Sequence, residues 1–341
     1  MNRMRRILLV CLCFLSSLTG VFAQEVLLGA TGGAATGTLY GIDPRTGTAT
    51  GIGLLVDGSG HSYAVTGLAF DNVAGILYGS TSNNSPTGSR SLVAIDPLTG
   101  AVTPIGSFAT SGTMADLTFD ITTTTLYGTG SLDGNLYSIN VATGVATAIG
   151  SAGFPAGSTV GNGVAANSAG QIFGSPQGAS GSLVQYNKTN GSVTTVATLS
   201  GAPFSSGSIG AMAFNSGGTL FGVNIDINTG TRPTDLVTIN SITGAVTDIG
   251  ASANFLDAIV FMTPVPEPTT TLLFGAGVLF LTIMLVRRCR NCSSPNEPKA
   301  SRLFVDNHAQ RPARLLANAF GVSCVARLAA AGDHRTALTQ R

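Results

Sequence analysis

The stretch Leu92–Gly106, LVAIDPLTGAVTPIG, decides the fold because variants of it recur through the chain. The other copies are LYGIDPRTGTATGIG from Leu39, LYSINVATGVATAIG from Leu136, LVQYNKTNGSVTTVA from Leu183 and LVTINSITGAVTDIG from Leu236. Successive copies start 53, 44, 47 and 53 residues apart. Each copy contains two apolar runs separated by a turn with glycine, which predicts a short hairpin.

Two further phrases accompany the copies and complete a unit of four strands. One ends at Phe70, Phe119, Ala166, Phe214 and Phe261, and is rich in small apolar residues (GLAF, DLTF, GVAA, AMAF, AIVF). The other follows it as ILYGS, TLYGT, QIFGS and TLFGV, with a degenerate copy VLLGA at Val26. A period of about 45 to 50 residues with several short strands is typical of β-propellers. We expect the small-residue strand to be innermost and an Asp or Asn turn to follow it.

The two ends of the repeat region complement each other. The first copy, 26–53, lacks the inner strand, whereas the last copy, 256–261, consists of that strand alone. Together they would make one blade, because pairing of the N- and C-terminal strands removes the free sheet edges. The sequence therefore predicts an all-β protein with a five-bladed β-propeller closed by its termini. An open β-solenoid is the alternative, since a solenoid also repeats but needs no complementary ends.

Composition narrows the classes of function. Only 10% of the 341 residues are charged, and 45 are glycine. Residues 24–263 hold twelve acidic and four basic residues, a net charge of −8, and no cysteine. This charge excludes a nucleic-acid-binding surface, and disulfides do not stabilise this region.

The first 23 residues have the features of a secretory signal peptide. Arg3, Arg5 and Arg6 precede a short apolar run, and small residues lead to a predicted cleavage site between Ala23 and Gln24. The export machinery is therefore an expected partner. The alternative, an uncleaved anchor, needs a longer apolar segment, about 20 residues.

Residues 269–286, TTTLLFGAGVLFLTIMLV, are uncharged and predict one C-terminal transmembrane helix. The arginines after it would stay in the cytoplasm, and a buried core helix is the alternative. The residues that flank the segment are Val265, Pro266, Glu267 and Pro268 before it, and Arg287, Arg288 and Arg290 after it. The two prolines favour an extended backbone.

This order of Pro-Glu-Pro, apolar helix and arginine cluster resembles the PEP-CTERM sorting signal of exported bacterial proteins. The resemblance implies processing by an exosortase-type membrane transpeptidase. It further implies an inner-membrane intermediate, then the cell surface or extracellular matrix of a Gram-negative bacterium, beside extracellular polysaccharide. The expected map is signal peptide 1–23, propeller 24–263, sorting signal 264–290 and a basic, disordered tail 291–341. Such signals usually end soon after the arginines, so this tail departs from the pattern.

Residues suited to chemistry are few in the exported region. His61 precedes an inner strand, and Asp116 and Asp257 lie at or beside the start of inner strands, so the three are candidates for the channel mouth. The residues Asn224, Asp226 and Asn228 alternate like the oxygen ligands of a calcium loop, but their glycine is displaced and the closing Glu is missing. We therefore predict no cofactor, with Ca²⁺ as the candidate ion if there is one.

Two classes of function remain. The first is a noncatalytic surface or matrix scaffold for adhesion, carbohydrate contact or assembly. The second is a propeller enzyme, such as a lactonase, lyase or glycan hydrolase, working in the channel mouth with His61 and the two carboxylates or with a metal. We favour the first, because no catalytic triad, phosphate loop or dinucleotide fingerprint is present in the sequence.

Overall fold

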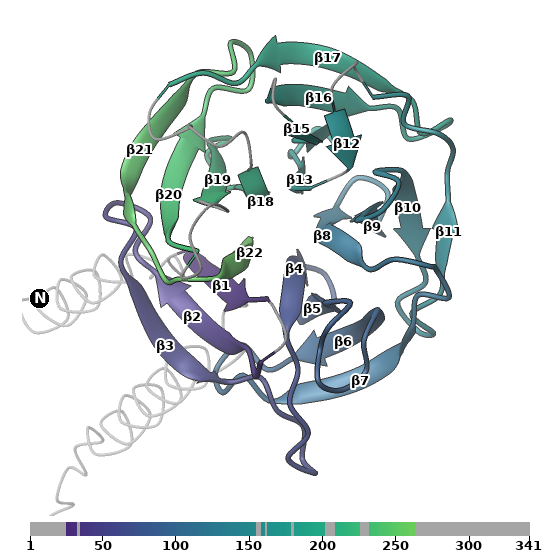
Figure 1. The fold of residues 1–341 in the computed structure, drawn as a ribbon, viewed down its shortest axis with the longest axis vertical. Helices are drawn as coiled ribbons and strands as arrows, with labels where there is room; N and C mark the ends of the chain where they lie inside the picture. The colour runs from purple at the N-terminus through teal and green to yellow at the C-terminus, as the bar shows by residue number, and fades with distance from the viewer. Residues whose placement is uncertain are drawn as a thin grey trace, which may run out of the picture. The chain divides into compact units, whose positions relative to one another are not determined.

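The computed structural model describes residues 25–32, 35–154, 158–160, 162–178, 181–201, 209–225 and 232–263. These residues form five four-stranded antiparallel sheets arranged in a ring (Figure 1). The all-β, five-bladed propeller is therefore confirmed. The predicted signal peptide, sorting segment, transmembrane helix and basic tail lie outside the described residues.

Each blade runs from an inner strand at the centre to an outer strand at the rim. Blade 1 contains β22 (Leu256–Met262), β1 (Val26–Thr31), β2 (Thr38–Ile42) and β3 (Ala49–Leu54). Blade 2 contains β4 (Val65–Asp71), β5 (Ile76–Thr81), β6 (Ser91–Ile95) and β7 (Val102–Ser107). Blade 3 contains β8 (Met114–Asp120), β9 (Thr125–Gly130), β10 (Leu136–Ile139) and β11 (Ala146–Ala148).

The last two blades follow the same order. Blade 4 contains β13 (Val164–Ala166), β14 (Ile172–Gly174), β16 (Ser182–Tyr186) and β17 (Val193–Thr198). Blade 5 contains β18 (Ile209–Phe214), β19 (Leu220–Ile225), β20 (Thr234–Ile239) and β21 (Val246–Ala251). A two-stranded pair, β12 (Ser158–Val160) with β15 (Gln177–Gly178), lies outside the blades and was not predicted.

The ring is closed by its first and last strands. β22 pairs antiparallel with β1, so that Leu27 lies opposite Phe261 and Gly29 lies opposite Ile259. Blade 1 thus takes three strands from the N-terminal side and one from the C-terminal side, as the sequence predicted. The solenoid alternative is wrong, because this pairing joins the two ends of the repeat array.

The hydrophobic core is divided among the five interfaces between neighbouring blades. Successive side chains of a strand point to opposite faces of its sheet. Leu28 and Val260 of blade 1 therefore pack with Leu68 of blade 2. Leu27 and Ile259 of the same blade face the other way, into a cluster that contains core residues of blade 5. Each blade is buried on both faces, so no single blade has a core of its own.

The repeated turns explain the phrase that recurs in the sequence. In all five outer hairpins, an Asp or Asn side chain accepts a hydrogen bond from the backbone N–H two residues later (Asp43, Asp96, Asn140, Asn187 and Asn240). The glycine that ends each turn has a φ between 72° and 80°, which disfavours other residues (Gly47, Gly100, Gly144, Gly191 and Gly244). The local chemistry of the hairpin therefore fixes these positions.

A second glycine, in the outer strand or just after it, allows neighbouring blades to approach. A β-carbon on Gly53, Gly106 or Gly150 would overlap a backbone carbonyl oxygen of the next blade's outer hairpin. Gly250 of blade 5 packs in the same way against Thr46 of blade 1. The rim of the ring is thus held by close backbone contacts, which include the interface that closes it.

Candidate functional site

The inner strands β4, β8, β13, β18 and β22 surround the centre of the ring (Figure 1). Asp116 on β8 is fully buried there. Its Oδ2 atom accepts hydrogen bonds from the backbone N–H groups of Val164 on β13 (2.9 Å) and Met212 on β18 (3.1 Å). Its Oδ1 atom accepts one from the N–H of Leu117 (2.9 Å).

Asp116 has a structural role through these bonds. The central edge of an inner strand has no further strand to pair with, so its N–H groups need another acceptor. The Asp116 carboxyl provides it and joins the inner strands of blades 3, 4 and 5. Burial nevertheless raises the pKa of Asp116 well above its ordinary value, and the negative charge of Asp257 adds to this.

A cavity of about 250 Å³ lies where the inner strands begin, and we call it the polar cavity. Its lining includes the hydroxyl side chains Thr66, Ser82, Thr113 and Ser131. It also includes the carboxamide side chains Asn83, Asn84, Asn162 and Gln177. The remaining lining residues are Ala115 and Asp257. The polar cavity is therefore lined almost entirely by uncharged groups that form hydrogen bonds, with one carboxyl.

Asp257 is half-buried on the closing strand β22. Backbone lies close on two sides, because a β-carbon on Gly32 would come 2.6 Å from its Oδ2 atom and one on Gly210 would come 3.3 Å from its Oδ1 atom. Burial raises the pKa of Asp257 to about 7, and the attraction of Arg232 counteracts this only in part. A carboxyl of this pKa holds and releases a proton near neutral pH.

His61 does not join these carboxyls. It is absent from the lining of the polar cavity, and its Nδ1 atom lies 2.9 Å from Oδ2 of Asp57. The Tyr63 hydroxyl donates to the same oxygen at 3.0 Å. Although burial opposes it, hydrogen bonds from His61 and Tyr63 lower the pKa of Asp57 to about 2. His61 is 59% exposed, so this group resembles a loop-fixing network more than a catalytic centre.

The calcium candidates are only partly visible. Asn224 is buried on β19, whereas Asp226 and Asn228 lie outside the described residues. Within the described ranges, no three His, Cys, Asp or Glu side chains come together in a group suited to a metal ion.

A second cavity, of about 260 Å³, lies at the other end of the inner strands and was missed by the sequence analysis. Four phenylalanines at or next to the ends of the inner strands line it, namely Phe70, Phe119, Phe214 and Phe261. Glu25 and Thr263 line it as well. The first described residue and the last one therefore lie at the same cavity.

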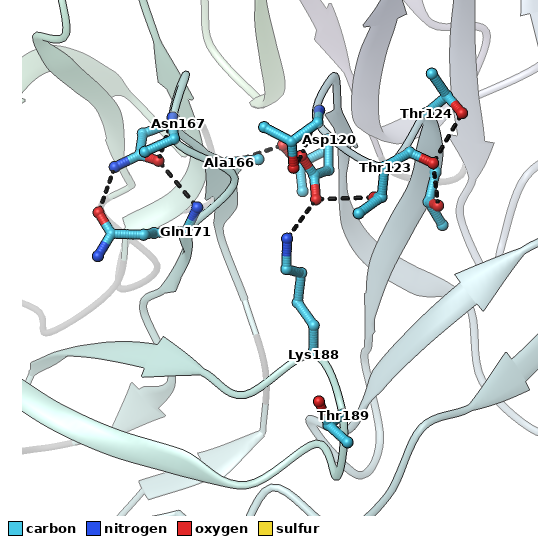
Figure 2. Close-up of polar contacts among 12 residues, drawn as sticks. Asp120, Thr123, Thr124, Ala166, Asn167, Gln171, Lys188 and Thr189 are labelled. Atoms are coloured by element: carbon cyan, nitrogen blue, oxygen red, sulfur yellow. Dashed lines mark hydrogen bonds and ion pairs between the residues drawn. The ribbon is translucent and has the colours of Figure 1, made fainter.

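The turns around this second cavity include one ion pair between blades. Figure 2 shows Lys188, in the outer hairpin of blade 4, reaching Asp120 at the end of β8 in blade 3. The Nζ–Oδ2 distance is 2.7 Å, and the Asp120 side chain is fully buried. Burial acts to raise the pKa of Asp120, but hydrogen bonds from Lys188 and Thr122 outweigh it and lower that pKa. This pair stabilises the interface between the two blades.

A family described as a repeat of unknown function, DUF6923, matches residues 29–207, just over half of the chain. The chain belongs to this family. The match runs from blade 1 to the outer strand β17 of blade 4. The matched residues form most of blade 1 and all of blades 2, 3 and 4 of the five-bladed propeller.

The PEP-CTERM protein-sorting motif matches residues 264–288. It contains Val265–Pro268 and the first two arginines, as the sequence resemblance indicated. The motif implies export, membrane-associated sorting in Gram-negative bacteria and processing by exosortase, a membrane enzyme. No membrane-crossing helix is found in the described part of the chain, and the predicted span 269–286 lies outside it.

Several solved structures are similar in fold. A chain from a nidogen/laminin complex is 14% identical with a TM-score of 0.45, covering 70% of this chain and 98% of that one. A Bacteroides thetaiotaomicron protein of unknown function is 19% identical (TM-score 0.42; 58% and 53% covered). A gluconolactonase from Xanthomonas campestris is 13% identical (TM-score 0.41; 70% and 80% covered). No curated protein matches the sequence.

Proposed function

We propose that the protein is a noncatalytic propeller scaffold, delivered by its PEP-CTERM motif to the cell surface or extracellular matrix. One observation carries the proposal. The closing strand β22 ends at Met262, and the sorting motif begins at residue 264. Cleavage within the motif would therefore release a ring that keeps all its blades and its closure.

The hydrogen bonds of the fully buried Asp116 carboxyl support a scaffold. Asp116 accepts three backbone hydrogen bonds, from three inner strands, and this leaves it little freedom to act on a substrate. His61 is exposed and bound to Asp57. Neither candidate is arranged as a general base that faces a cavity.

Mapping both termini of the cell-envelope form by peptide mass spectrometry in the native host tests the proposal. We expect a mature N-terminus at Gln24 and a C-terminus near Pro266–Pro268, with no peptide from the tail 291–341. Recovery of intact tail peptides with the propeller in the membrane fraction would instead indicate a protein anchored by one span. Sorting would then be wrong for this chain.

A propeller enzyme is the second candidate, and Asp257 is the observation that favours it. Its carboxyl lines the polar cavity, and its pKa of about 7 suits general acid or base catalysis. Screening the full chain against lactones and glycosides, with Asp257→Asn as the comparison, tests this reading. Turnover that this substitution abolishes would support the enzyme. If EDTA lowers the melting temperature, the enzyme would also contain a metal, since a bound ion stabilises the folded state.

A further inference from the structure

Some groups that line the polar cavity form hydrogen bonds that hold its shape, and others can still bond to a ligand. The Thr66 hydroxyl donates to the carbonyl of Met114 at 3.0 Å. The Thr113 hydroxyl donates to the carbonyl of Thr81, and the Thr113 N–H donates to Oδ1 of Asn83 at 3.1 Å. These bonds connect blades 2 and 3, so the cavity is already formed without a ligand.

Other polar groups in the same cavity have capacity left. The buried Ser131 hydroxyl has no hydrogen-bond partner in the described part of the chain. The Asp257 carboxyl accepts no hydrogen bond from the described residues, and only Arg232 and Asp116 act on it electrostatically. The amide nitrogen of Asn83 is not used by the bond to Thr113. A buried polar group without a partner is destabilising, so a ligand that bonds to the Ser131 hydroxyl and to the half-buried Asp257 carboxyl would be favourable, and the exposed Asn83 amide can reach the same ligand.

The chemistry of the lining limits what that partner is. No Lys or Arg is among the described residues that line the cavity, and Asp257 would repel an anion. Hydroxyl and carboxamide side chains both donate and accept hydrogen bonds, which complements a ligand dense in hydroxyl groups. The volume of about 250 Å³ is below the ~300–1,000 Å³ of sites for drug-sized ligands, so one small ring fits better than an extended molecule.

We propose that the polar cavity binds one neutral sugar unit, with the Asp257 carboxyl accepting hydrogen bonds from adjacent sugar hydroxyls. Asn83 and Ser131 complete the contacts from blades 2 and 3. This inference concerns a ligand, whereas the proposed function concerns delivery, and each stands if the other fails.

Saturation-transfer NMR on the full chain in detergent tests the site. The probes are glucose, galactose, mannose and N-acetylglucosamine at millimolar concentration. Asp257→Asn removes the carboxylate and keeps its shape, and Ala115→Leu fills the cavity without removing a polar group. Asp96→Asn, in an exposed outer hairpin, is the matched control. Circular dichroism confirms that each variant is folded.

We expect at least one sugar to bind the wild type and the Asp96 variant, and to bind the Asp257 and Ala115 variants at least tenfold more weakly. A lost hydrogen bond to a charged group is worth about 1.5–3 kcal/mol, and about 1.4 kcal/mol is tenfold in affinity. Absence of transfer from all four sugars would overturn the proposal. Equal binding by all variants would do so too, because the sugar would then bind elsewhere. Stabilisation by CaCl₂ alone, lost in Asp257→Asn, would replace it with a cation site.

Discussion

Replacing Asp116 by alanine tests whether a single carboxyl holds the centre of the ring. The substitution removes the acceptor of three backbone N–H groups, at 2.9, 2.9 and 3.1 Å. Each buried donor left without a partner costs about 1–3 kcal/mol. Two effects reduce the total, since water can enter the emptied space and the buried carboxyl was itself costly to desolvate.

We therefore expect Asp116→Ala to lower the free energy of unfolding by about 3 kcal/mol, the lower end of that range. In a domain of this size, about 1 kcal/mol shifts the melting temperature by roughly 2–4 °C, so the shift should be roughly 6–12 °C. Circular dichroism of the full chain in detergent, heated at pH 6, measures it.

The matched control is Asp96→Ala in the outer hairpin of blade 2. Asp96 also accepts hydrogen bonds, from the N–H of Leu98 and the hydroxyl of Thr99, but it is exposed. Water replaces those bonds, so the control should lose about 1 kcal/mol or less. Equal shifts of the melting temperature for the two variants would refute this reasoning. They would show that burial between three strands does not increase the contribution of these hydrogen bonds to stability.

Three further predictions concern the blade interfaces and the polar cavity. Gly106→Ala should lower the melting temperature by roughly 5 °C or more, because its β-carbon would overlap the Thr143 carbonyl, whereas Gly58→Ala, in open space, should change it little. Lys188→Met should destabilise by about 1–3 kcal/mol in urea unfolding at pH 7, since its buried carboxylate partner is left unpaired. The melting temperature should fall as the pH rises from 5 to 8, and Asp257→Asn should reduce this fall, while the buried Asp116, whose pKa is also raised, accounts for the remainder.

The sign of the pH effect follows from proton binding. The native Asp257 carboxyl has a pKa of about 7 and the unfolded one a pKa of 3.8, so the native state binds more protons between these values. Stability from this group is therefore complete below about pH 4 and is lost as the pH rises through 7. A stability independent of pH in this range would contradict it. Equal melting temperatures of the two glycine variants would contradict the first prediction. A free energy of unfolding that Lys188→Met leaves unchanged would contradict the second.

The repeats allowed most of the fold to be predicted, because each blade has the same pattern of apolar, turn and glycine residues. The hairpin glycines at positive φ, the Asp and Asn turns and the complementary end copies were all visible in the sequence. The pair β12–β15 was not, since it interrupts the repeat in blade 4 alone.

The site was harder to predict, because its residues break the pattern instead of repeating it. The inner-strand positions equivalent to Asp116 are Gly67, Gly163, Ala211 and Ala258, all small. A lone carboxyl among small residues was a signal that this side chain fills the centre, but the strands it would bind could not be read from one sequence. The lining of the polar cavity comes from three consecutive blades and the closing strand, so only the closed ring brings it together.

The closing strand also sets the order in which the protein can mature. Strand β1 must wait for a partner that begins 230 positions later, at Leu256. Contacts this distant in sequence form slowly, and an unpaired edge invites association with other chains in the meantime. A polypeptide truncated during synthesis before β22 would lack both ring closure and the sorting motif that follows. Closure of the ring and sorting of the protein therefore both require that translation continues past β22 and through the sorting motif.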